Sequence, residues 1–261
     1  AAEAAAAKGT PAEDLWKSES IAVAWDNAAK DHAAQADDYR KEIAAYLEAH
    51  PQGIDGVWAL DQVKFIVAHL AESILNRMEY WGATAKDRAE LAPLSTLADR
   101  LLTQATLSLA AAMHDSETKS PFDEADYTRA YTANAEAEYY AAWVKYLQTM
   151  AMDAATDGGA APRRRLLSSA ADALGKWADD KQDNGVNNQS LLLRGKARSE
   201  AGQYDLAIAD LQRAAVADHS PGWLRYQARY QSIVTRLRAG DFSAATTELA
   251  ALRRTLAAGD L

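Results

Sequence analysis

The sequence predicts an all-α protein, and three features of its composition and pattern carry this prediction. Alanine is abundant, whereas Gly and Pro occur only 13 and 6 times in 261 residues, so long stretches contain no helix breaker. Apolar residues recur at three- and four-residue steps, which is the spacing of one face of a helix. β-branched residues nowhere alternate over more than a few positions, which argues against strands.

The first half of the chain contains long helical segments separated by few breakers. Pro11 suits the first turn of a helix, and the segment after that helix stops at Pro51. Pro93 closes a connector over residues 82–93, and residues 115–123 form the first clear loop. The expected helices cover residues 12–35, 37–50, 54–81 and 94–113.

The second half begins with a long aromatic helix and ends in four shorter helices. The aromatic helix covers residues 124–156, and the "DGGAAP" stretch at 157–162 ends it. Pro162 then begins a further helix, which a polar loop follows. The last four expected helices cover residues 188–201, 204–217, 222–238 and 242–256.

The short loops make consecutive helices antiparallel, so we expect a string of helical hairpins. Such hairpins form either a bundle or a stacked solenoid, and an internal repeat distinguishes the two. Residues 191–216, "LLLRGKARSEAGQYDLAIADLQRAAV", share a pattern with residues 239–252, "AGDFSAATTELAAL". The matched positions are Leu191, Gly195, Gly202, Tyr204, Ala207, Leu211 and Ala214 in the first hairpin, and Gly240, Phe242, Ala245 and Leu249 in the second.

This pattern resembles the tetratricopeptide repeat (TPR) over residues 188–256. The resemblance implies stacked antiparallel helical hairpins that form a TPR-like right-handed superhelix, an α-solenoid. The physical reasons for the pattern are simple: a glycine before the aromatic residue permits the tight turn, and the aromatic side chain fills the corner of the hairpin. Small residues on the facing helices let the two helices approach closely.

The sequence departs from the TPR pattern in two ways. Arg194 and Arg198 stand where the family prefers an apolar residue and Tyr. The distance from Gly202 to Gly240 is 38 residues, whereas the family repeats every ~34 residues. The two arginines therefore mark either a degenerate repeat or a modified surface.

We expect a single α-helical repeat domain over residues 1–261, with a sub-boundary near 115–123. Residues 1–118 would be divergent hairpins, and residues 119–261 the TPR-like part. The first residues include no initiator Met, which fits either a mature end left by cleavage or a piece of a longer protein. No apolar run reaches the ~20 residues of a membrane span, so we expect a soluble protein, either cytoplasmic or exported to the periplasm with its signal removed.

The charge of the chain bears on its partners. The net charge of −9 argues against nucleic acid, because phosphate binding needs a basic face. Residues 1–160 hold 13 basic and 26 acidic residues, whereas residues 161–261 hold 15 basic and 11 acidic residues. Such an asymmetry either steers a charged partner toward the basic part or reflects solvated surface only. The absence of cysteine removes disulfides and thiolate zinc sites.

No arrangement of residues indicates an enzyme, a cofactor or a metal. His69 and Glu72 lie one turn apart on an expected helix, but no second pair of this kind completes a metal site. The glycines at 158–159 lack the Lys-Ser/Thr of a phosphate-binding loop, and no serine lies in a Gly-x-Ser-x-Gly turn. We therefore expect a non-catalytic protein without a cofactor.

Two groups of residues are candidates for binding. Tyr139 and Trp143 lie one turn apart on the aromatic helix, where they either pack between hairpins or form the wall of a ligand pocket. Arg163, Arg164 and Arg165 lie at a helix start, where positive charge opposes the helix dipole. An acidic group beside these arginines would offset this unfavourable charge. It would come either from the acidic half of this chain or from a partner.

The TPR resemblance also implies a binding surface. In TPR proteins the first helix of each repeat lines a concave surface that binds extended peptides. The resemblance places Lys196, Glu200, Tyr230 and Arg238 near this surface. The leading hypothesis is therefore a protein–protein interaction or scaffold module that binds a protein or peptide through a TPR-like groove. The alternative is a helical protein that binds a small ligand or glycan, with residues 127–146 as the pocket wall.

Overall fold

The computed structural model describes residues 32–50, 54–153, 160–180, 186–218 and 220–258. Over these residues the protein is all-helical and contains no strand, which confirms the predicted all-α class. The helix expected after Pro11 lies outside the described residues. The chain forms two compact units, residues 1–151 and 152–261. No helix among the described residues is long and apolar enough to cross a membrane.

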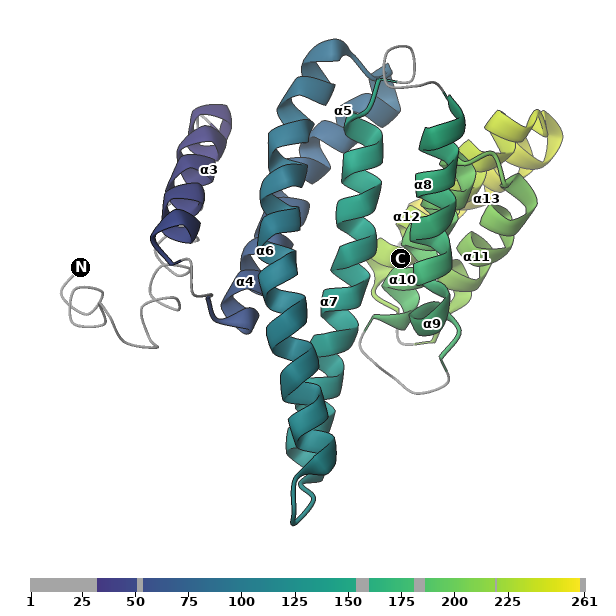
Figure 1. Ribbon diagram of the computed structural model, residues 1–261. Helices are drawn as coiled ribbons and strands as arrows, with labels where there is room; N and C mark the ends of the chain where they lie inside the picture. Colours follow the sequence, from purple (N-terminus) through teal and green to yellow (C-terminus); the bar gives the residue numbers. More distant parts are fainter. Residues whose placement is uncertain (1–31, 51–53, 154–159, 181–185, 219, 259–261) are drawn as a thin grey trace. The chain divides into compact units, whose positions relative to one another are not determined.

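The first unit is built around a long antiparallel helical hairpin (Figure 1). Its two helices are α6 (Ala85–Thr118) and α7 (Glu124–Ala151), which pack against each other along much of their length. Three consecutive helical segments without a break between them pack on α6. They are α4 (Gly56–Phe65), the π-helix η1 (Ile66–Ala71) and α5 (Glu72–Trp81). α3 (His32–Ala49) joins them through the Tyr39 hydroxyl, which donates a 3.0 Å hydrogen bond to Oε1 of Gln62.

α6 begins nine residues earlier than the sequence predicts. The prediction of a connector over residues 82–93 rested on Pro93, which interrupts helical hydrogen bonding, and it was wrong. Thr84 and Asp87 form a capping box that starts the helix at Ala85. Packing on both sides of Pro93 then holds it within the helix, because Leu91 and Leu94 are buried.

The boundary between the two units lies at a different place from the one expected near residues 115–123. Residues up to Thr118 continue α6, so the turn between α6 and α7 covers only residues 119–123. The two helices pack together in one hairpin, which keeps this turn inside the first unit. The second unit begins at Met152.

The second unit consists of consecutive helices that pack on their neighbours. α8 (Ala160–Ala173) and the short α9 (Gly175–Ala178) pack against α10 (Asn187–Glu200). α10 packs against both α11 (Tyr204–Val216) and α12 (Gly222–Ala239), and α12 also contacts α11 and α13 (Phe242–Ala258). The ends of the last four helices lie within two residues of the predicted ends.

The hinges at Gly202 and Gly240 have the same backbone geometry. Both glycines adopt the left-handed backbone conformation, with φ angles of 82° and 81°. The residue after each glycine donates its N–H to a carbonyl five residues back, at 2.9 Å in both hinges. This is the hydrogen bond of a Schellman motif, and its positive φ favours glycine. The sequence pattern at 202–204 and 240–242 therefore encodes one hinge twice.

The positions of the repeat pattern differ in burial between the two hairpins. Most of them lie in the core of the second unit: Leu191, Gly195, Ala207, Leu211, Ala214 and Ala245. Tyr204 is half-buried, whereas Phe242 and Leu249 are 66% and 46% exposed. The expectation that Phe242 fills the corner of its hairpin was wrong, because most of its side chain is exposed to solvent.

Candidate binding surface

The residues predicted to bind a partner lie in two places. Lys196 and Glu200 belong to α10, and Tyr230 and Arg238 belong to α12, all within the second unit. Tyr139 and Trp143 belong to α7 of the first unit. The two groups are therefore separate candidates.

Glu200 bridges two arginines from different helices. Its Oε2 lies 3.1 Å from Nη2 of Arg163 on α8, and its Oε1 lies 2.6 Å from Nη1 of Arg238 on α12. The side chain of Glu200 is only 15% exposed, so the two pairs are partly shielded from solvent. The sequence placed Glu200 and Arg238 on one surface, and the structure brings them into contact.

The helices joined at Glu200 carry three further basic residues, Arg164 and Arg165 on α8 and Lys196 on α10. We call Arg163, Arg164, Arg165, Lys196 and Arg238 the basic cluster; its members lie on α8, α10 and α12. Arg164 and Arg165 are exposed, and neither forms a hydrogen bond or ion pair with a described residue. Arg163 pairs with Glu200, which belongs to the same unit.

Tyr230 takes part in the packing between α12 and α13. Its ring stacks on that of Tyr226 with a centroid distance of 6.5 Å and an interplanar angle of 14°. Both rings pack against the cluster formed by Ile233, Ala245 and Leu252. Tyr230 is half-buried, so it joins α12 to α13 and offers only part of its ring to a ligand.

A second set of charges, which the sequence reasoning missed, lies inside the unit. Arg194 is 3% exposed and binds the Asp210 carboxylate at 2.7 and 2.9 Å. It also binds Asp179, whose pKa falls to about 2 because Arg194 and then Arg213 hydrogen-bond to its carboxylate, against the opposing effect of burial. Arg198 adds a 2.6 Å bond to Asp210. The sequence did contain a signal for these ion pairs: Asp210 lies on the buried face of α11, opposite Arg194 and Arg198 of α10.

Tyr139 and Trp143 bind each other. The indole Nε1 of Trp143 donates a 2.7 Å hydrogen bond to the Tyr139 hydroxyl. Tyr139 is buried, and burial raises its pKa above the usual value. Trp143 packs edge-on against Tyr146 at 5.7 Å. This arrangement corresponds to the packing interpretation of the aromatic helix.

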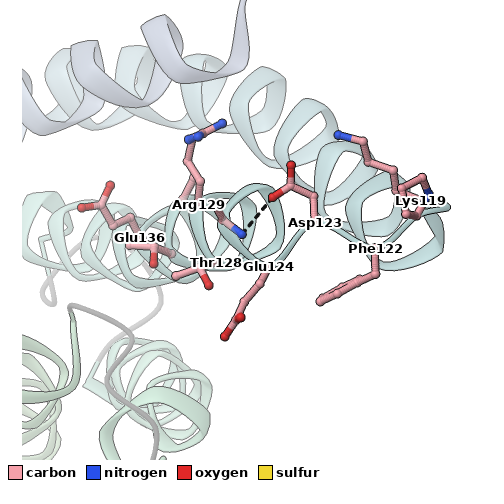
Figure 2. A pocket seen from close by; sticks show the side chains of 11 residues that line it. Lys119, Phe122, Asp123, Glu124, Thr128, Arg129 and Glu136 are labelled. Carbon is pink, nitrogen blue, oxygen red and sulfur yellow. Dashed lines mark hydrogen bonds between the residues drawn. The ribbon is translucent and has the colours of Figure 1, made fainter.

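The first unit carries an open groove at the tip of its hairpin, with a volume of about 1130 Å³ (Figure 2). The groove is lined by the turn at residues 119–123 and by α7 as far as Glu136, and neither Tyr139 nor Trp143 lines it. Its charged groups are largely satisfied: Asp126 binds Lys119 and Arg129, and Asp123 accepts hydrogen bonds from two backbone N–H groups at the start of α7.

A smaller cavity of about 230 Å³ lies between the end of α3 and the middle of α6. It is lined by Leu47, His50, Ile54, Arg100, Thr103 and Gln104. The Nδ1 atom of His50 lies 2.9 Å from the carbonyl oxygen of Tyr46.

The described residues contain no group of three or more His, Asp or Glu side chains that could hold a metal ion. The ring of His69, the residue considered with Glu72 as a metal pair, lies tilted against the ring of Phe65, with a centroid distance of 5.0 Å. The sequence matches no protein-family model, and no curated protein or solved structure matches it. Function is therefore inferred from the residues of this chain.

Proposed function

We propose that this chain is a non-catalytic interaction module that binds an acidic segment of a protein or peptide at the basic cluster. The observation that carries the proposal is the pair Arg164 and Arg165, two exposed side chains that no described residue neutralises. They lie in the first turns of α8, where the helix dipole opposes positive charge. A carboxylate from outside the chain would relieve this repulsion and form charge-assisted hydrogen bonds.

The ion pairs around Glu200 hold this surface in place. Arg163 and Arg238 each form an ion pair with Glu200, so α8 and α12 are tied to the last turn of α10. Arg238 also donates to the Ser199 hydroxyl at 3.4 Å, and this hydroxyl accepts a 3.0 Å bond from Thr235. A surface fixed in this way loses little conformational entropy when a peptide binds.

The proposal includes a TPR-like arrangement for residues 187–258. The equal geometry of the hinges at Gly202 and Gly240 supports it, as does the packing of α10 on α12. In this arrangement α10 and α12 are the first helices of successive repeats. Lys196 and Arg238 would then lie on the surface that binds extended peptides in that family.

The experiment measures binding of a fluorescein-labelled octaglutamate peptide by fluorescence anisotropy. We expect saturable binding that weakens with added salt, and no binding of an octalysine peptide. The double variant R164A/R165A should lose at least about tenfold in affinity. Equal binding of the two peptides would contradict the proposal.

A matched control separates this cluster from general attraction. Arg253 and Arg254 on α13 are also adjacent, exposed and without a described partner. R253A/R254A removes the same charge from the same unit and should leave the affinity for octaglutamate within about twofold. An equal loss in both double variants would show that net charge alone attracts the peptide.

A further inference from the structure

The cavity between the end of α3 and the middle of α6 combines polar and apolar side chains in a small volume. Its described lining residues are Leu47, His50, Ile54, Arg100, Thr103 and Gln104. None of these is acidic, and Arg100 carries a permanent positive charge. The volume of about 230 Å³ equals that of ~7 water molecules in the liquid. The cavity therefore has room for a small organic molecule.

α6 supplies most of the polar groups of this cavity. Thr103 and Gln104 lie three and four residues after Arg100, which places all three on one face of the helix. Neither the Arg100 nor the Gln104 side chain forms a hydrogen bond or ion pair with a described residue. The Thr103 hydroxyl donates to the carbonyl oxygen of Asp99 at 2.9 Å. A guanidinium and an amide therefore remain available to a ligand.

His50, which directly follows α3, is held in one orientation. Its ring stacks on that of Tyr46 with a centroid distance of 4.1 Å, and its Nδ1 lies 2.9 Å from the Tyr46 carbonyl oxygen. A carbonyl oxygen only accepts hydrogen bonds, so Nδ1 carries the proton of the neutral ring. The second nitrogen, Nε2, is then an acceptor, and no described residue donates to it. Such a nitrogen suits a hydroxyl group.

We propose that this cavity binds a small hydroxycarboxylic acid. The Arg100 guanidinium binds the carboxylate through two parallel hydrogen bonds, which are stronger than bonds between neutral groups. The ligand hydroxyl donates to Nε2 of His50, and the short carbon chain contacts Leu47 and Ile54. The site belongs to the first unit, so this inference goes beyond the proposed peptide binding and does not depend on it.

The lining residues disfavour the other small ligands of this size. An inorganic anion has only acceptor oxygens for Nε2 of His50, and it gains nothing from Leu47 and Ile54. A metal cation prefers carboxylate ligands, whereas the described lining holds no acid and one arginine. A hydroxycarboxylic acid uses the cation, the acceptor and the apolar side chains together.

Isothermal titration calorimetry with 2-hydroxybutyrate tests the proposal at about pH 8, where a free imidazole is neutral. We expect saturable binding with a dissociation constant of ~1 mM or below. Butyrate, which lacks the hydroxyl, should bind more weakly, and the uncharged 2-hydroxybutyramide should not bind. No binding of 2-hydroxybutyrate at ~20 mM would overturn the proposal. Equally tight binding of the amide or of inorganic phosphate would also overturn it.

Arg100→Leu should weaken the binding of 2-hydroxybutyrate at least about tenfold. The matched control is Lys86→Gln, because Lys86 lies on the same helix, is 85% exposed and does not line the cavity. This control should change the affinity less than about twofold. The variant R164A/R165A should behave like the control, since the basic cluster lies in the second unit. An equal loss in Arg100→Leu and Lys86→Gln would contradict the proposed site.

His50→Phe tests the role of the imidazole separately. Phenylalanine keeps the stacking on Tyr46 but has no acceptor nitrogen, so the variant should bind butyrate and 2-hydroxybutyrate equally. A retained preference for the hydroxy acid would overturn the assignment of Nε2.

NMR locates the ligand even where a variant does not fold. The chain contains five histidines, and the imidazole signal that is missing from folded His50→Phe, or else broadened by a spin label on Leu47→Cys, is that of His50. In the wild type this signal should shift with 2-hydroxybutyrate along the calorimetric binding curve. A signal that stays in place while the acid binds would overturn the proposal, because the ligand would then lie elsewhere.

Discussion

Arg194 and Asp210 form a two-point ion pair inside the second unit, between α10 and α11. The Nε and Nη2 atoms of the guanidinium lie 2.9 and 2.7 Å from the two carboxylate oxygens, and both side chains are less than 5% exposed. The arginine that departs from the TPR pattern is thus matched by an acid on the facing helix. It belongs to the interior of the hairpin and not to a modified surface.

We expect Asp210→Ala to destabilise the protein by ~3–5 kcal/mol, because it leaves the Arg194 charge buried without its main partner. The double variant R194M/D210L should recover most of this loss, since it removes both charges together. Urea unfolding followed by circular dichroism measures both effects. A loss below ~1 kcal/mol for Asp210→Ala would mean that Asp179 alone satisfies Arg194.

Gly195→Ala should destabilise the second unit by ~1–3 kcal/mol through overpacking. A Cβ atom at this position would lie 2.6 Å from Cγ of Leu211 and 3.3 Å from the carbonyl oxygen of Ala207. The control is Gly175→Ala, whose new Cβ would meet only a nitrogen of Arg194 at 3.7 Å. Its unfolding midpoint in urea should stay within error of the wild type or rise.

Tyr139→Phe should cost about 1 kcal/mol of stability, because it removes the acceptor of the Trp143 indole N–H while keeping the ring. Thermal unfolding measures the loss. The same variant should bind octaglutamate as the wild type does. If instead it keeps full stability, the Tyr139–Trp143 bond does not support the first unit, and the ligand-wall interpretation of this helix gains ground.

Acid should weaken the second unit through Asp179. Its folded pKa of about 2 lies below the ordinary value of 3.8, because Arg194 and Arg213 bind the ionised carboxylate. A depressed pKa adds stability above the ordinary value, and that stability is lost as the pH falls toward the folded value. The urea midpoint should therefore fall between pH ~4 and ~2. Asp179→Asn should be less stable at neutral pH and show a shallower fall over this range.

Alkali should weaken the first unit through its buried tyrosines. Burial, with a smaller contribution from Glu136, raises the pKa of Tyr140 from 10.0 to about 12. Because the folded state holds this proton more tightly, the added stability is present below pH 10 and is lost as the pH rises toward 12. Tyr140→Phe should reduce this alkaline loss. Tyrosinate absorbance and circular dichroism, recorded together, measure ionisation and unfolding.

Helix ends were predictable where residues of special backbone chemistry mark them. Gly202 and Gly240 end α10 and α12 in the left-handed conformation, and Pro221 precedes α12. The helix end predicted at Pro93 was wrong. The free-energy cost of the one hydrogen bond that proline removes is small compared with the stabilisation that a 34-residue helix gains from packing. The candidate surface was only partly predictable: the pattern puts Glu200 and Arg238 on one surface, but their ion pair depends on how α10 and α12 pack together.

The sequence by itself determined the all-helical class and the two matched hinges, because helix propensity, capping and positive-φ glycines act over a few neighbouring residues. Only the tertiary structure decided which charges meet, since Arg163 and Glu200 are 37 residues apart in the chain. It also decided that Leu211 is buried while Leu249, at the same pattern position, is exposed. Burial depends on which helix packs alongside, and that is a property of the fold and not of the local pattern.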